Sequence, residues 1–292
     1  MTDTEVNKAD RPRWLINIEK NMEEDFGQFP SISPSYELVR DLLIAPKDSD
    51  TAVSDAVNRF YDSYTSNGDR ERREPPDYMA GFKLNTIASV VFETTRDVFY
   101  TSFEHDRLVE FLVGIKKGAA AEYDPENPQF VYHSWGLEAI VEESWNASHV
   151  DGKTHHLADE PEQVWSEGWL NISGLISKLY RQGLLDTDGL LWVSSDLQKA
   201  LETKKEENVS SDAGRQAQVL AAINHILIAG EVFARDVKAA SEKQKADLNA
   251  EKLKMWADRM KEIADLVDDS ARWNLKERAM EGHELMVELL LE

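Results

Sequence analysis

Two adjacent polar residues, Asn224 and His225, interrupt the longest segment of the chain that lacks charge, the stretch between Arg215 and Glu231. An imidazole can donate, accept or carry a proton near neutral pH, and an amide can orient a ligand. Buried groups of this kind must be hydrogen-bonded or face a wet cavity. Two interpretations therefore stay open, namely a core histidine with satisfied hydrogen bonds, or one polar wall of a pocket.

The second interpretation predicts a ligand-binding set built from two helices. Its members are Trp169, Asn171, Asn224, His225 and Glu231. Glu231 follows His225 by about 1.7 helical turns, and Arg235 lies one turn further on, where we expect it to pair with Glu231. The sequence assigns no catalytic residue within this set.

Familiar cofactor and metal motifs are missing from the sequence. It has no Gly-x-Gly-x-x-Gly, Walker lysine, His-Glu-x-x-His or Gly-x-Ser-x-Gly pattern. His155 and His156 are adjacent in a polar stretch, where their side chains diverge. The turn that begins at Asp186 lacks the later ligands of a calcium loop. We therefore expect no cofactor and no bound metal.

The elements that would position these side chains are helices. One predicted helix carries apolar residues at spacings of four, three, four and three: Trp165, Trp169, Ile172, Ile176 and Leu179. The uncharged segment has a similar stripe and should form a central, buried helix: Val219, Ile223, Ile226, Gly230 and Phe233. No alternating pattern of useful length occurs. The sequence predicts an all-α fold, an orthogonal or bundle array of about ten helices with no significant sheet.

Breaks in the pattern predict the domain organisation. Residues 1–34 hold few apolar residues and are predicted to be a flexible arm, and residues 35–66 a pair of helices. Residues 66–77 contain Asn-Gly and Pro-Pro, which suit a linker. The main helical domain is expected over residues 80–292, either separate from the helical pair or continuous with it.

The composition bounds the function. Of 292 residues, 55 are Asp or Glu and 33 are Lys or Arg, a formal charge of −22, which argues against general nucleic-acid binding. The cluster Arg70, Arg72 and Arg73 alternates with acids and is expected to be a solvated loop. There is no cysteine, no signal peptide and no apolar run of membrane-spanning length, so we expect a cytoplasmic or nuclear protein that is not secreted.

Several segments resemble a fungal family of all-helical proteins known only as a domain of unknown function. Its central motif resembles this run: Glu167, Trp169, Asn171, Leu175, Ser177, Lys178 and Leu179. Ala229-Gly230-Glu231 and the segment 253–260, with Trp256, are similar to two further motifs, and the likeness covers residues 80–292. Leu175, Ser177 and Lys178 stand where the family has an aromatic residue, Ala and Arg. The resemblance implies a helical fold and a fungal source but no reaction.

Two functions remain open. The first is a helical module that binds a protein partner or a small ligand, with an acidic surface suited to a basic partner. The alternative is a cofactor-independent enzyme of fungal specialised metabolism, such as a cyclase or an aminoacyl-tRNA-dependent condensing enzyme. The oligomeric state cannot be read from the sequence.

Overall fold

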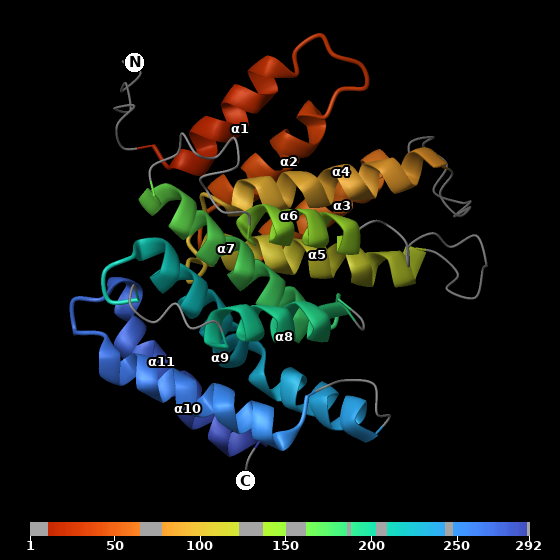
Figure 1. Cartoon of the computed structure of the whole chain (residues 1–292). Helices are drawn as coiled ribbons and strands as arrows, with labels where there is room; N and C mark the ends of the chain where they lie inside the picture. Colours follow the sequence, from red (N-terminus) through yellow and green to blue (C-terminus); the bar gives the residue numbers. More distant parts are fainter. Residues whose placement is uncertain are drawn as a thin grey trace. The chain divides into compact units, whose positions relative to one another are not determined.

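The computed structural model describes residues 11–64, 78–122, 137–149, 162–185, 188–202, 209–242 and 248–290. Within these ranges the chain forms eleven α-helices, one short 3-10 helix and no strand (Figure 1). The predicted all-α array of about ten helices is confirmed. By its internal contacts the chain divides into two compact units, Met1–Ser144 and Trp145–Glu292.

The boundary between these two units falls inside helix α6 (Leu137–His149). The main helical domain expected over residues 80–292 stays a prediction. The predicted linker over residues 66–77 and the arginine cluster within it lie outside the described residues. Within the predicted arm, residues 13–24 form a helix whose Trp14 and Ile18 are buried. Polar contacts add to this burial, because Asn17 donates to Asp97 at 2.5 Å and Asn21 donates to Glu93 at 2.7 Å.

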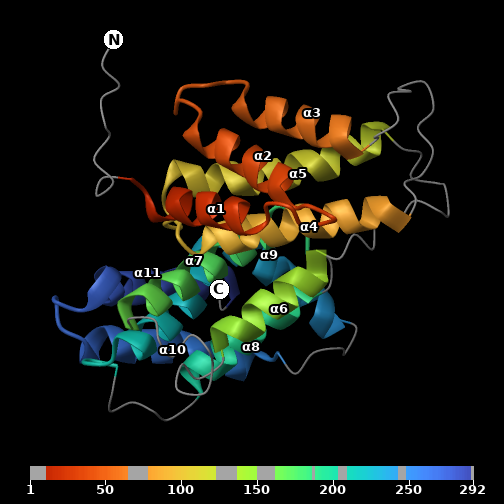
Figure 2. The ribbon, with the colours of Figure 1, turned by 90° about the horizontal axis from the view of Figure 1, so that it is seen from above.

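The described part of the N-terminal unit contains five helices and the start of α6. They are α1 (Arg13–Glu24), α2 (Ser33–Ile44), α3 (Ala52–Tyr64), α4 (Tyr78–Thr95) and α5 (Phe103–Glu122). Helix α2 packs against α1, α3, α4 and α5 (Figure 2), and its Val39, Leu42 and Leu43 are buried. The apolar face of α2 is therefore directed at the core of this unit.

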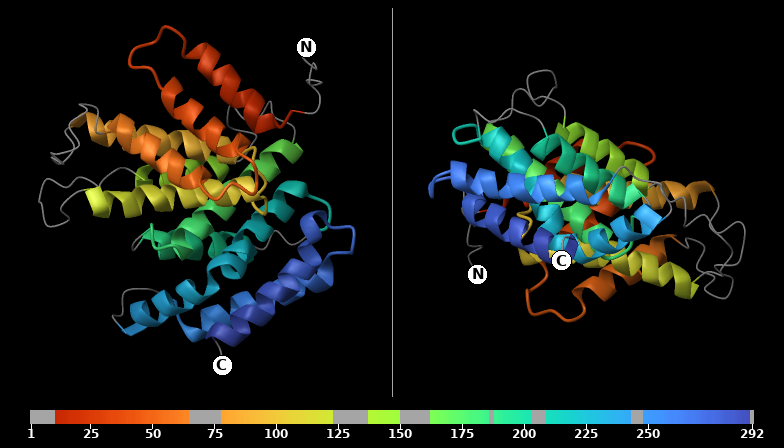
Figure 3. Two further views of the ribbon diagram at one scale, coloured as in Figure 1. Left: turned by 180° about the vertical axis from the view of Figure 1, so that it is seen from behind. Right: turned by 60° about the horizontal axis from the view of Figure 1, so that its bottom comes forward.

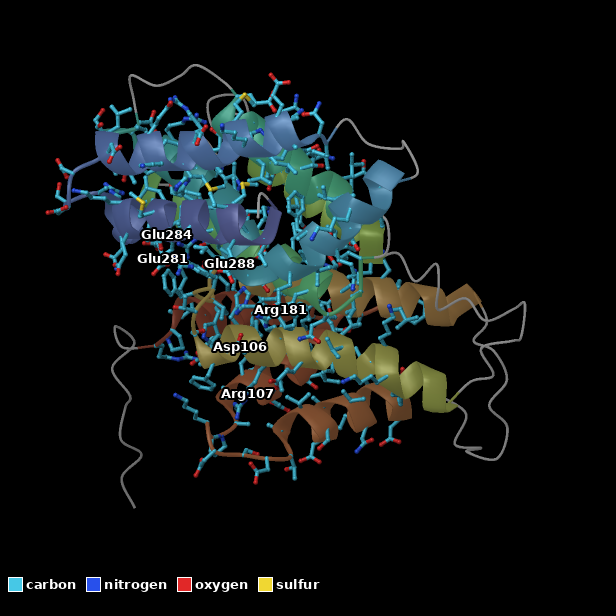
Figure 4. The ribbon with its side chains drawn as sticks, turned by 90° about the horizontal axis from the view of Figure 1, so that it is seen from below. Asp106, Arg107, Arg181, Glu281, Glu284 and Glu288 are labelled. Atoms are coloured by element: carbon cyan, nitrogen blue, oxygen red, sulfur yellow. The ribbon has the colours of Figure 1, made fainter. Side chains whose placement is uncertain are left out.

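Arg107 of α5 closes the C-terminal end of α2 (Figure 4). Its guanidinium donates hydrogen bonds to the carbonyl oxygen of Leu42 at 3.3 Å and of Ala45 at 2.6 Å. The last carbonyls of a helix have no partner within the helix and carry partial negative charge. A buried arginine is stabilised at this position because it satisfies both needs.

The C-terminal unit contains α7 (Glu162–Arg181), α8 (Asp188–Leu201), α9 (Ala213–Glu242), α10 (Ala250–Leu266), the 3-10 helix η5 (Arg272–Asn274) and α11 (Leu275–Leu290). Every residue from 168 to 180 is buried, because α7 packs along α9 and beside α8. Helices α10 and α11 lie side by side (Figure 3). The predicted stripes on α7 and α9 are buried except for Trp165, which is half-buried.

Helix α9 is the one helix of the described chain that is long and apolar enough to cross a membrane by length and composition. Its most apolar window is 72% buried inside the structure, as is common for the core helix of a soluble protein. The helix also bends at Ala229, whose backbone leaves the helical region. We interpret α9 as a core helix, as the sequence predicted.

Candidate functional site

His225 lies at the centre of a hydrogen-bonded group from four helices. Its Nδ1 is 2.7 Å from Oγ of Ser177 on α7, and its Nε2 is 2.8 Å from Oδ2 of Asp196 on α8. The indole Nε1 of Trp145, on α6, donates to the other carboxylate oxygen of Asp196 at 2.7 Å. Both oxygens of this buried carboxylate are therefore hydrogen-bonded.

The number of available protons restricts the state of the group. The hydroxyl of Ser177 has one proton to donate. Its oxygen lies 2.7 Å from both the carbonyl oxygen of Ser173 and Nδ1 of His225. If the hydroxyl donates to Nδ1, the imidazole is neutral and its remaining proton is on Nε2. If the hydroxyl donates to the carbonyl, Nδ1 of His225 must donate to the hydroxyl oxygen of Ser177.

Serine, histidine and aspartate in this order are the residue types of a nucleophilic triad. A nucleophile must reach a substrate, however, and the side chains here are enclosed. Ser177 and His225 are 0% exposed and Asp196 is 4% exposed. As it stands, the arrangement joins α6, α7, α8 and α9 and satisfies buried polar groups. We call it the core polar network.

The network approaches solvent at Lys199 on α8. Its Nζ lies 3.9 Å from the centre of the Trp145 ring, within the range of a cation–π interaction. Burial lowers the pKa of Lys199, and the nearby carboxylate of Asp196 partly opposes this shift by raising the pKa. Lys199 thus covers the ring of Trp145 and places a positive charge close to the network.

Asn224 faces a different helix from its neighbour His225. Its Oδ1 accepts a hydrogen bond from Nη2 of Arg278 on α11 at 3.2 Å, and Nη1 of Arg278 donates to Glu281 at 3.0 Å. Among the described residues, Nδ2 of Asn224 and Nε of Arg278 are buried without an acceptor. The side chains of Asn224 and His225 therefore point to different helices and do not line one side of a common pocket.

The remaining predicted residues lie elsewhere on α7 and α9. Trp169 is buried and packs edge-on against Trp165 with ring centres 5.1 Å apart, and Asn171 is buried in the same helix. Glu231 is exposed on α9. Arg235 forms its ion pair with Asp236 at 2.9 Å rather than with the predicted Glu231.

The sequence did not predict a second structured feature, the turn between α1 and α2, residues 25–33. Oδ2 of buried Asp25 accepts bonds from the hydroxyls of Ser31 and Ser33, at 2.5 and 2.6 Å, and from the backbone N–H of Ile32 and Ser33, at 3.0 and 2.8 Å. These bonds, that of Ser31 foremost, lower the pKa of Asp25 to about 2. Gly27 supplies a backbone φ of +82°, which favours glycine.

This α1–α2 turn exposes two aromatic rings, although its backbone is well fixed. Phe26 is 91% and Phe29 100% exposed to solvent. An open groove of about 450 Å³ is lined by Phe26 together with Glu19, Met22 and Glu23. The turn projects beyond the ends of its two helices at the top of Figure 1. Asp25 followed by Gly27 and two serines is the signal that could have predicted the turn.

The chain was also compared with known proteins. Residues 89–275 match the family described as a protein of unknown function, DUF3632. This chain is a member of the DUF3632 family. The matched segment includes the core polar network but begins after the α1–α2 turn. No curated protein and no solved structure matches this DUF3632 chain.

In the described part of this DUF3632 chain, no three His, Asp or Glu side chains are grouped as metal ligands would be. His155 and His156, which the sequence placed in a polar loop, lie outside the described ranges.

Proposed function

We propose that this chain is a protein-binding module whose docking site is the α1–α2 turn. The observation that carries the proposal is the pair of exposed rings, Phe26 and Phe29, on a backbone held by four hydrogen bonds to Asp25. A fixed loop loses little conformational entropy on binding, and aromatic residues are the commonest anchors of interfaces. We place the module in the cytoplasm or nucleus of a fungus as part of the same proposal.

The core polar network supports a structural role for the C-terminal unit. Its side chains bond to one another rather than pointing into a pocket, and Ser177 and His225 are fully buried. The alternative of a cofactor-independent enzyme would need α7, α8 and α9 to separate before Ser177 could act. A fluorophosphonate probe tests this alternative, because covalent labelling of Ser177 in the folded chain would favour the enzyme.

Photocrosslinking tests the proposed docking site. The photoreactive residue p-benzoylphenylalanine replaces Phe29 in one variant and Leu191, which is 61% exposed in the other unit, in a control variant. Both are irradiated in an extract of the source cells, and crosslinked proteins are identified by mass spectrometry. We expect one identified partner at position 29 and not at position 191. The same set of proteins at both positions, or none at position 29, would contradict the proposal.

A further inference from the structure

Resting on the proposed function, we infer that the partner of the α1–α2 turn is a basic amphipathic helix with an apolar anchor. The groove residues Glu19, Met22, Glu23 and Phe26 follow one another at spacings of three, one and three, so they form one face of α1 and its continuation. A partner helix can lie along such a face with its own apolar stripe inward.

The charges beside the groove select the sign of the partner. Two of the four lining residues are glutamates, and exposed Glu24 is adjacent. Glu19 pairs with Arg11, and Glu24 lies 3.5 Å from Lys20. Glu23 is exposed and has no ion-pair partner among the described residues. Lysine or arginine flanking an apolar anchor would complement this rim, and the formal charge of −22 on the whole chain would speed its approach.

A second copy of this chain is a poorer occupant. A two-fold interface sets each patch against itself, so Glu23 and Glu24 of one copy would face the same carboxylates of the other. Like charges at an interface disfavour the contact. Phe26 and Phe29 would have to overcome that repulsion.

A membrane surface is also a poorer occupant. Exposed phenylalanines can enter the boundary of a bilayer, but membrane-binding helices carry basic residues next to their apolar face. Cytoplasmic leaflets are negatively charged and would repel Glu23, whose carboxylate has no ion-pair partner among the described residues. The acidic rim therefore favours a basic protein segment over a lipid surface.

The acidic residues of α11 supply an internal comparison. Glu281, Glu284 and Glu288 lie along this helix (Figure 4), and Glu284 and Glu288 are exposed. Among the described residues, α11 has no large exposed apolar side chain. A basic peptide that binds only by charge should bind α11 and the α1–α2 turn alike. A basic peptide that also needs an apolar contact should bind the turn alone.

The test uses the full chain and three probes. The first is a fluorescent 18-residue amphipathic helix of lysine and leucine, the second its glutamate and leucine counterpart, and the third a vesicle containing phosphatidylserine. Binding of the peptides is followed by fluorescence anisotropy and binding to vesicles by flotation. We expect the lysine peptide alone to bind.

Matched variants locate the binding. The double variant Phe26→Ser, Phe29→Ser should lower the affinity for the lysine peptide about tenfold or more, whereas Leu191→Ser should lower it less than about twofold. Glu23→Lys should lower the affinity for the same peptide about fivefold, and Glu284→Lys less than about twofold. Equal losses in Glu23→Lys and Glu284→Lys, or binding of the glutamate peptide or the vesicles instead, would overturn the basic partner. The photocrosslinked partner at position 29 would still stand in that event, because it does not depend on charge.

Discussion

The core polar network and the α1–α2 turn use polar groups in opposite ways. In the network, Ser177, Asp196 and His225 satisfy one another inside the core, where they join four helices and reach no solvent. In the turn, the carboxylate of Asp25 fixes a loop that leaves Phe26 and Phe29 in water. Residue types that suggest catalysis are thus enclosed in the core, while an ordinary turn presents two aromatic rings to solvent.

The largest expected effect is at Asp196. The substitution Asp196→Ala removes the hydrogen-bond partner of buried Nε2 of His225 and the acceptor of half-buried Nε1 of Trp145. Removing one partner of a buried pair costs about 3 to 5 kcal/mol of unfolding free energy. Urea denaturation measures the loss, and Asp258→Ala, at an exposed position of α10, serves as the control. A loss no larger than that of the control would show that the network does not stabilise the fold.

A smaller loss is expected for Ser177→Ala. The hydroxyl oxygens of Ser177 and Ser194 both lie 2.7 Å from the carbonyl oxygen four residues earlier, but only Ser177 also contacts His225. An unsatisfied buried ring nitrogen costs about 1 to 3 kcal/mol, so Ser177→Ala should be destabilising while Ser194→Ala is close to neutral. Equal losses of unfolding free energy for the two substitutions in the same urea titration would show that the contact between Ser177 and His225 does not stabilise the fold.

At the turn, the expected effect depends on pH. Because the folded pKa of Asp25 is lowered to about 2, its contribution to stability is present above the usual pKa of an aspartate, near 4. That contribution is lost as pH falls from about 4 to about 2. The protection factor of the Ser33 amide against hydrogen exchange should therefore fall over this interval, and Asp25→Asn should lower it already at pH 7. Unchanged exchange in Asp25→Asn would mean that the carboxylate does not fix the turn.

The smallest expected effect on stability is that of Phe26→Ser with Phe29→Ser. Both rings are exposed, so their removal should change the free energy of unfolding by less than about 0.5 kcal/mol. Thermal melts of this variant and of Leu191→Ser should match the wild-type protein. A melting temperature several degrees lower would show that the rings pack against the protein. That result would contradict their role as binding anchors.

The sequence predicted the helical elements well because each core stripe is a local pattern. The stripes around Trp169 on α7 and Ile223 on α9 follow from spacing alone. The partners of His225 could not be predicted in this way, since Ser177 precedes it by 48 residues and Asp196 by 29. Only the packing of α7, α8 and α9 brings them together.

Adjacency in sequence was misleading at Asn224. Neighbouring residues of a helix point about 100° apart, so Asn224 bonds to α11 while His225 turns toward α7 and α8. The α1–α2 turn was missed for another reason. The scarcity of apolar residues before Pro34 predicts a loose arm, whereas Trp14 and Ile18 are buried and Asn21 donates a hydrogen bond to Glu93 of α4.

Hydroxyl-radical footprinting of the full chain, with and without the lysine and leucine peptide, tests the central contrast most directly. The account predicts strong oxidation of Phe26 and Phe29 in the absence of peptide, and protection of both in its presence. Leu191 should be oxidised equally in both samples, and His225 in neither. Oxidation of His225, or protection that spares Phe26 and Phe29, would contradict the assignment of the network to the core and of binding to the turn.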